Sequence, residues 1–269
     1  MDGAQFEQPD NRPSVNSTCY FCMRPSDAEH ILEIIVCTIE DAVAAERGGA
    51  NRLEIISHYE VGGLTPSFDL VQEITSTVKI PARVMLRESE PFVVTDEDEI
   101  ESLLNAARAF AGLPIDGFVL GFLKGSPSGL QIDHSLLSRV LACAPNLKAT
   151  FHRAFEEASD PFQAIAELKR HPQIDCILSR GRGEAWESEV YRFIEWERAA
   201  SPEMRMLVGG GTDKEAIEVF CKASPIRAFH VGRAVREQER IDGTVLAEQV
   251  RQIDEQIRNY RREIPQLND

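Results

Sequence analysis

The segment ILEIIVCTIEDAVAAERGGA, residues 31–50, joins a short apolar run to an amphipathic stretch. The run at 31–36 has the length and branched apolar composition of a buried strand. Across 38–50 apolar residues recur every three or four positions, as on one face of a helix, and Gly48 and Gly49 end the pattern. The segment therefore predicts one strand followed by one helix.

The same unit recurs along the chain. Seven further apolar runs lie at 52–56, 82–87, 116–123, 147–152, 175–179, 205–209 and 227–232. Helical segments follow them at 67–78, 96–111, 133–144, 161–171, 188–200, 213–223 and 244–257. Strands that are apolar throughout are buried on both faces, as in a parallel sheet covered by helices.

Eight strand–helix units are the number found in one α/β fold, the (β/α)8 TIM barrel, and the length of the chain is usual for that fold. An open doubly wound sheet is the alternative. No glycine-rich dinucleotide-binding turn follows the first strand, where IVCTIED (35–41) stands, so the barrel is favoured. We expect a single barrel domain at 31–260, between a flexible, polar N-terminal arm at 1–30 and a C-terminal tail at 261–269.

The composition excludes several classes of partner. The chain has 29 Lys and Arg against 44 Asp and Glu, a formal charge of −15, which disfavours nucleic acid and anionic membrane surfaces. No apolar run has the length of a membrane span, and the N-terminus lacks the basic start and apolar core of an export signal. No small-domain disulfide pattern is formed by Cys19, Cys22, Cys37, Cys143, Cys176 and Cys221. We expect a reduced, cytoplasmic protein.

Two acidic residues interrupt the first two strands. If Glu33 and Glu54 face inward, two carboxylates enter the barrel interior together, and each needs a cation, a donor or a raised pKa. Candidate partners are Arg87, His152 and His230. Glu33 or Glu54 would then act as acid or base with His152, while Arg87 neutralises developing charge. The alternatives are a structural polar plug and, for His230 alone, a satisfied core histidine.

The loops after the last two strands are rich in glycine. VGGGTDKE (208–215) precedes a helix, and HVGRAV (230–235) ends the final strand. Barrels frequently bind phosphate in these two loops, where glycines let an anion approach backbone N–H groups. Two tight turns are the alternative, and the charge of Asp213 opposes an anion. The predicted anion-binding residues are Gly209, Gly210, Gly211, Thr212, Gly232, Arg233 and His230.

Several motifs together resemble one protein family. They are LEI (32–34), ERGGANRLE (46–54), GGLTPS (62–67), TFHRAFE (150–156), GGG (209–211) and FH (229–230). In their order and spacing the chain is similar to the CutC copper homeostasis proteins, which are (β/α)8 barrels. The resemblance covers about residues 32–234. It implies a cytoplasmic protein linked to copper handling and copper ion binding, and often a homo-oligomer.

The chain departs from the family at the proposed copper ligands. The family commonly carries cysteine where this chain has Ile35 and Ile56. Isoleucine has no donor atom, so soft Cu(I) lacks thiolate ligands at these positions. The strand-end carboxylates, arginine and histidine are nevertheless retained, and these residue types are typical of an enzyme.

A pair of thiols occurs elsewhere, in the N-terminal arm. Cys19 and Cys22 form a C-x-x-C, which suits Cu(I) or half a zinc site. An incidental or oxidisable pair is the alternative. The sequence thus leaves three functions open: copper handling, acid/base catalysis on a small anionic or phosphorylated substrate, and a non-catalytic scaffold. The expected ligand is accordingly a small anion or a metal ion.

Overall fold

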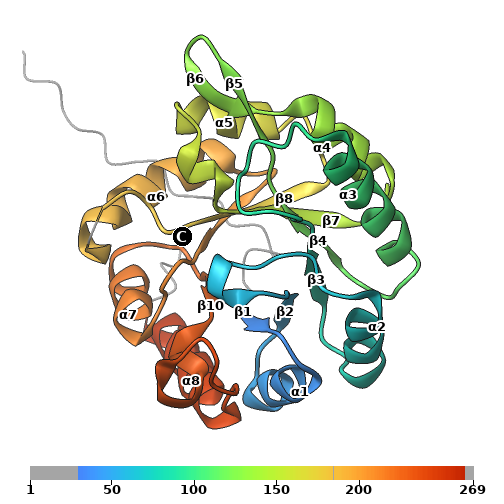
Figure 1. The fold of residues 1–269 in the computed structure, drawn as a ribbon. Helices are drawn as coiled ribbons and strands as arrows, with labels where there is room; N and C mark the ends of the chain where they lie inside the picture. Colours follow the sequence, from blue (N-terminus) through green and yellow to red (C-terminus); the bar gives the residue numbers. More distant parts are fainter. Residues whose placement is uncertain (1–29, 184, 264–269) are drawn as a thin grey trace, which may run out of the picture.

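The computed structural model describes residues 30–183 and 185–263. In this part of the chain eight parallel strands close into a barrel with helices around it (Figure 1). Around the ring the strands are β1 (Ile31–Val36), β2 (Arg52–Ile55), β3 (Ala82–Met85), β4 (Gly117–Leu120), β7 (Lys148–Phe151), β8 (Ile174–Ser179), β9 (Arg205–Val208) and β10 (Ala228–Val231). Pairing of β1 with β10 closes the ring and confirms the predicted (β/α)8 barrel.

A helix follows each strand of the ring. The helices are α1 (Ile39–Gly48), α2 (Phe68–Thr77), α3 (Glu97–Phe110), α4 (His134–Ala142), α5 (Pro161–Leu168), α6 (Trp186–Ala200), α7 (Lys214–Ala223) and α8 (Ala247–Glu263). Short polar side chains accept hydrogen bonds from the first free N–H groups of six of them and so fix where they begin: Thr38, Ser67, Asp96, Asp133, Asp160 and Asp213. Helix α8 runs to Glu263, into the segment expected as a tail.

One predicted strand divides in two. The apolar run at 116–123 ends its barrel strand at Leu120, and Leu123–Ser126 (β5) then pairs antiparallel with Gly129–Ile132 (β6). This hairpin projects from the rim of the barrel beside α5 (Figure 1). The hairpin was not predicted, because the apolar run continues past the end of β4 to Leu123 without a polar residue.

A layer of charged side chains fills the barrel near the N-terminal ends of its strands. The guanidinium of Arg83, whose side chain is 2% exposed, donates to Thr150 Oγ1 (2.7 Å), to Asp116 (2.9 Å) and to both oxygens of Asp175 (2.7 and 2.8 Å). These bonds satisfy its donors inside the ring, so the interior is a packed core at this end. Any cavity must lie toward the opposite, C-terminal ends of the strands.

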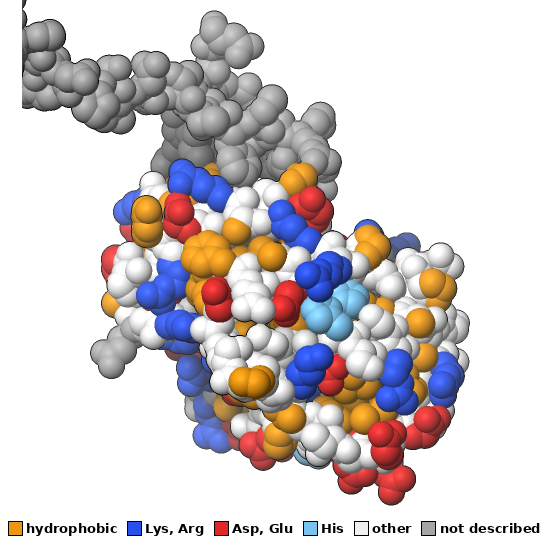
Figure 2. Space-filling model, turned by 90° about the horizontal axis from the view of Figure 1, so that it is seen from above, with side chains coloured by type: hydrophobic (Ala, Val, Ile, Leu, Met, Phe, Trp, Pro, Cys, Tyr) orange, Lys and Arg blue, Asp and Glu red, His pale blue; other side chains and the backbone are white. Residues whose placement is uncertain are grey.

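The outer surface carries charges of both signs. Figure 2 shows Lys and Arg side chains interspersed among acidic ones on the face it presents. No helix of the described segments is long and apolar enough to cross a membrane. The arm expected at 1–30, apart from its last residue, lies outside the described residues, and so do Cys19 and Cys22.

Candidate functional site

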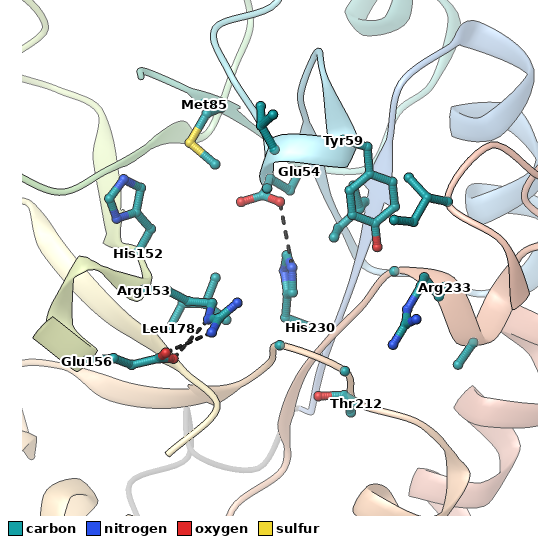
Figure 3. Close-up of a pocket in the computed structure, with 18 of the residues that line it drawn as sticks. Glu54, Tyr59, Met85, His152, Arg153, Glu156, Leu178, Thr212, His230 and Arg233 are labelled. Carbon is teal, nitrogen blue, oxygen red and sulfur yellow. Dashed lines mark hydrogen bonds and ion pairs between the residues drawn. The ribbon is translucent and has the colours of Figure 1, made fainter. Parts of the chain in front are cut away.

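A cavity of about 580 Å³ opens at the C-terminal ends of the barrel strands (Figure 3). Strand-end side chains form its floor, and the loops after the strands form its walls. Most of the predicted site residues line it: Glu54, Arg87, His152, Gly210, Gly211, Thr212, His230, Gly232 and Arg233. Glu33 and Gly209 do not line it. The structure therefore brings together residues that are up to 179 positions apart, from Glu54 to Arg233.

Glu33 lies below the cavity and is held by two bases. The strand register sets it opposite Arg52 on β2 and His230 on β10. Arg52 Nε donates to Glu33 Oε2 at 2.5 Å, and His230 Nδ1 is 2.8 Å from Glu33 Oε1. Burial raises the pKa of Glu33, but Arg52 and His230 more than offset that effect and lower it to about 2. Glu33 is thus a structural anion, paired with Arg52 and with His230, which was one of the three candidate partners. Arg87 and His152, the other two candidates, do not pair with it.

Glu54 is in a different state although it lies close by. Its Oε2 is 3.7 Å from His230 Nε2, and its Oε1 has no hydrogen-bond partner among the described residues. Burial of the side chain, which is 2% exposed, raises the pKa of Glu54 to about 7, against the opposing effect of His230. At neutral pH this carboxyl therefore gives up and accepts a proton with equal ease. That property suits general acid/base catalysis.

His230 bridges the two carboxylates. Because Glu33 is ionised, the Nδ1 of His230 carries the proton of their hydrogen bond, and Nε2 turns toward Glu54 and the cavity. Burial alone would lower the pKa of His230, but the negative charges of Glu54 and Glu33 raise it above its ordinary value. Its role as a satisfied buried histidine and its place in the cavity floor are therefore both seen in the structure.

His152 faces the cavity from the end of β7. Its Nδ1 accepts a hydrogen bond from the backbone N–H of Ala154 (3.2 Å), and its Nε2 has no partner among the described residues. Burial lowers the pKa of His152 to about 3, helped by the charge of Arg87. Gly121 makes room for the ring, because a Cβ there would lie 2.5 Å from Nδ1. A neutral imidazole thus stands at this wall.

Arg87 holds the wall of the cavity together. Its guanidinium donates to the carbonyls of Val61 (3.1 Å), Gly63 (3.2 Å), Ser89 (3.0 Å) and Glu90 (2.6 Å). It also lies over the ring of Phe92, 5.0 Å from its centroid. Because β3 ends at Met85, Arg87 stands above the barrel interior and does not reach Glu33.

Two other arginines differ in their freedom. Arg153 forms a two-pronged ion pair with Glu156, at 2.9 and 2.8 Å, so its charge is largely compensated. Within the described residues the guanidinium of Arg233 forms no hydrogen bond or ion pair. In Figure 3 Arg233 lies on the opposite side of Glu54 and His230 from His152. Arg233 is thus the cation at this cavity that remains available to a ligand.

The glycine-rich loop after β9 passes along the same side. Gly210 and Gly211 have φ angles of +75° and +108°, which glycine adopts without strain. A Cβ at Gly211 would meet nothing within 4 Å, so the backbone there is open to the cavity. The hydroxyl of Thr212 is used internally, because it donates to Val208 O (3.0 Å). Asp213 caps α7 through Ala216 N, so its carboxylate occupies the helix N-terminus where an anion was expected.

The positions without thiols lie side by side. Ile35 and Ile56 pack in one apolar cluster with Met85 and Val119, and Ile35 and Met85 line the cavity. Cys37 packs at the edge of this cluster, and burial raises the pKa of its thiol to about 11. None of the cysteines in the described residues lines the cavity. Within this part of the chain the cavity therefore offers one sulfur donor, the thioether of Met85, and no thiolate, which does not make up a Cu(I) site.

Glu33, Glu54 and His230 bring ligand atoms within 4.8 Å of one another, close enough to surround a cation. However, the positive guanidinium of Arg52 is in contact with Glu33, and both Glu33 oxygens are already hydrogen-bonded. A metal ion would find only two free donors there, fewer than a protein metal site usually offers. The cluster is better suited to moving protons.

Two residues of the site, Arg52 and Tyr59, were not among those predicted from the sequence. Arg52, which fixes the charge of Glu33, begins the apolar run RLEII, and an arginine two positions before an inward glutamate was an available signal. Tyr59 lines the cavity from the short 3-10 helix η2 (Tyr59–Val61) and left no signal in the strand pattern. A Cβ at Gly232 would lie 1.7 Å from its hydroxyl, so this glycine is required by Tyr59.

Comparison with known proteins gives a consistent picture. The model of the CutC family matches residues 30–235. The copper homeostasis protein cutC homolog of Homo sapiens is 37% identical over 202 residues, which cover 74% of this chain and 72% of the human protein. The Mus musculus protein of the same name is 39% identical over 201 residues, with 74% and 72% covered.

Solved structures share the fold. The putative copper homeostasis protein CutC from Streptococcus agalactiae superposes with a TM-score of 0.68 at 23% identity, over 79% of this chain and all of that one. A thiamine phosphate pyrophosphorylase from Pyrococcus furiosus superposes with a TM-score of 0.55 at 14% identity, over 87% and 98% of the two chains. At these identities the likeness concerns the barrel alone.

Proposed function

The chain belongs to the CutC family, and on that basis we propose that it serves copper homeostasis in the cytoplasm. The observation that carries this role is the family match itself, because it spans the barrel from β1 through β10 and includes most segments that line the cavity. Human and mouse relatives are named for the same process. Copper homeostasis is a cellular role and does not name a reaction or a binding site. The site must therefore be assigned from the residues of this chain.

Copper binding itself is proposed at Cys19 and Cys22, outside the described residues. Two thiolates suit Cu(I), whereas the cavity offers no thiolate. Competition titration of the full chain with a chromophoric Cu(I) chelator tests this assignment. The wild type should withdraw Cu(I) from the chelator, and the Cys19→Ser/Cys22→Ser variant should not.

A matched control for the copper titration is Cys143→Ser, which changes a half-buried thiol at the end of α4 and should leave the titration unchanged. Retention of Cu(I) by the double variant would refute the assignment to the arm.

A second candidate function is favoured by the cavity: acid/base catalysis on a small anionic or phosphorylated molecule. The specific observation is Glu54, a buried carboxyl with a raised pKa and an unpartnered oxygen in a cavity. Perturbed carboxyls in clefts are typical of catalytic sites. Arg233 and the open backbone at Gly211 supply the attraction for an anion.

Thermal unfolding of the full chain with inorganic phosphate tests the anion-binding part of this candidate. Because a ligand that binds only the native state stabilises it, millimolar phosphate should raise the Tm of the wild type. Arg233→Ala should reduce this rise. The control is Arg108→Ala, which removes an exposed arginine of α3 away from the cavity and should leave the rise intact. An equal rise in both variants would contradict a phosphate site at Arg233.

A further inference from the structure

Two polar atoms of the cavity lack partners. Glu54 Oε1 and His152 Nε2 form no hydrogen bond among the described residues, although their side chains are only 2% and 4% exposed. Buried polar atoms are nearly always hydrogen-bonded, because leaving one unsatisfied destabilises the native state. Two such atoms in one cavity indicate a ligand that provides both missing partners.

The hydrogen bond to Ala154 fixes which partner His152 requires. A backbone N–H can only donate, so the Nδ1 of His152 must present a lone pair to it. The neutral ring then carries its single proton on Nε2, and Nε2–H points into the cavity as a donor. A neutral imidazole that donates suits an uncharged oxygen on which negative charge develops during a reaction. A carbonyl oxygen is such an acceptor.

Glu54 lines the same cavity as His152. In Figure 3 the order across the cavity is His152, then Glu54 with His230, then Arg233. A ligand that spans this order places an oxygen at His152, the neighbouring carbon at the Glu54 carboxylate and an anionic group at Arg233. Such a ligand carries, in this order, a carbonyl group, an acidic C–H bond and an anionic group.

We propose that the cavity binds a small phosphorylated hydroxycarbonyl compound, with Glu54 as the base that removes a proton beside the carbonyl and His152 Nε2–H as the donor to the carbonyl oxygen. This inference rests on the second candidate function and names its substrate class and reaction. Gly121 is a positioning residue here, because only a residue without Cβ lets the imidazole occupy its place.

The step needs no further reactant. The Glu54 carboxylate takes the proton from the carbon next to the carbonyl, and the electron pair of that C–H bond forms a carbon–carbon double bond. The carbonyl π pair moves onto the oxygen, which is stabilised by His152 Nε2–H. Return of the proton from Glu54 to the carbon restores the carbonyl compound. Nothing is oxidised or reduced. In D2O the proton held by the Glu54 carboxyl exchanges with solvent deuterium before the return step, so the carbon receives deuterium.

The surroundings of Glu54 tune this base. His230 on β10 and Arg52 on β2 favour its charged form, whereas Glu33 on β1 and burial favour its protonated form. Tyr59 and Cys37, which also lie near Glu54, are neutral at pH 7 because burial raises the pKa of both, to about 12 and about 11. The rate of proton removal should therefore rise as the pH increases through about 7.

Proton exchange in D2O tests the inference. The full chain is incubated with dihydroxyacetone phosphate, and loss of the carbon-bound proton signal is followed by 1H NMR. We expect exchange by the wild type, at least about 100-fold slower exchange with Glu54→Gln, and a loss of similar size with His152→Gln. The control Glu97→Gln alters an exposed carboxylate at the start of α3 and should exchange like the wild type.

A second measurement does not depend on variants that fold. Long-range 1H–15N spectra of the wild type should show His152 as the neutral ring protonated at Nε2 at pH 7. A ring protonated at Nδ1, an imidazolium at that pH, or no exchange by the wild type would each overturn the inference. If phosphate still raises the Tm through Arg233 while exchange is absent, only the inference fails. If neither occurs, the second candidate function fails with it.

Discussion

Glu33 illustrates how one residue of this barrel remains charged without solvent. It is fully buried, and its two oxygens are taken by Arg52 and His230. Strand register places both partners directly opposite Glu33 on the neighbouring strands. Its neighbour Glu54 lacks such partners, and burial raises the pKa of Glu54 to about 7, so it is only partly ionised at neutral pH. Two inward carboxylates of adjacent strands thus have different roles because only one of them is in contact with an arginine.

Replacing Arg52 with Met should destabilise the protein by about 3–5 kcal/mol, because Glu33 is then left as a buried charge with one base in place of two. Urea unfolding at pH 7 measures the change. Arg108→Met, at an exposed ion pair, should alter the free energy of unfolding by no more than about 0.5 kcal/mol. Similar values for the two variants would refute the structural role of Arg52.

The same ion pair predicts a dependence on acid. The native pKa of Glu33, about 2, lies below its ordinary value of 4.5. The stabilisation from its ionised form is therefore present above pH 4.5 and is lost as the pH falls toward 2. In Arg52→Met the native pKa is no longer held so low, so this loss should be smaller between pH 4.5 and 2. Acid titration of both proteins under urea measures the difference.

His152 predicts a loss of stability at higher pH values than Glu33 does. Its pKa is about 3 in the native state against 6.5 when unfolded, so below pH 6.5 the unfolded chain binds a proton that the native state does not. The free energy of unfolding should fall by about 2–3 kcal/mol between pH 6.5 and 4.5 from this residue. His152→Gln lacks that contribution, so its stability relative to wild type should rise over the same interval. A constant difference would show that the native imidazole is charged.

At the level of single residues, the sequence predicted the site where strands end. Glu54 was expected there if the alternation along its strand places it on the inward face, and His152 and His230 were expected as its candidate partners from later strands of the barrel. The pairing between them was not predictable, because it depends on the stagger of strands β1, β2 and β10 around the ring. The hydrogen bonds of Arg87 were likewise not predictable, because they go to loop carbonyls whose positions no strand pattern specifies.

The strands and helices were readily predicted from period and caps. Continuous apolar runs predicted the buried strands, and the predicted helical segments at 67–78 and 133–144 begin at residues that the structure shows as N-caps, Ser67 and Asp133. The hairpin of β5 and β6 was missed because the apolar run that contains β4 extends to Leu123, the first residue of β5. Local patterns thus predicted the helices and strands. They did not predict where the apolar run stops pairing with the barrel strands and begins to pair with β6, because that point depends on tertiary packing.

Close approach of two strands predicts a sensitive glycine. A Cβ at Gly117 on β4 would lie 2.1 Å from the carbonyl oxygen of Lys148 on β7, and this backbone cannot move aside without separating the two strands. Gly117→Ala should destabilise the protein by about 1–3 kcal/mol in urea unfolding. Gly125→Ala on β5 is the matched control, because a Cβ there meets nothing within 4 Å. Equal effects would contradict the packing of β4 against β7.

The whole molecule combines an acidic composition with a barrel whose two ends differ in their side chains. The chain carries a net charge of −15, yet its cavity has an available cation in Arg233. Arg83 and its partners close one end of the barrel, and the cavity opens at the other. The fold therefore separates a charged layer that stabilises the barrel from a cavity lined by the titratable side chains of Glu54, His152 and His230.

The central claim is that Glu54 titrates near neutrality in this cavity, and its pKa can be measured directly. The 13C shift of the Glu54 carboxyl, assigned in the full chain by comparison with Glu54→Gln, is followed from pH 3 to 9. The account predicts a midpoint near pH 7, because burial outweighs the attraction of His230. A midpoint near the ordinary value of 4.5 would show an ordinary solvated carboxylate and would contradict the account.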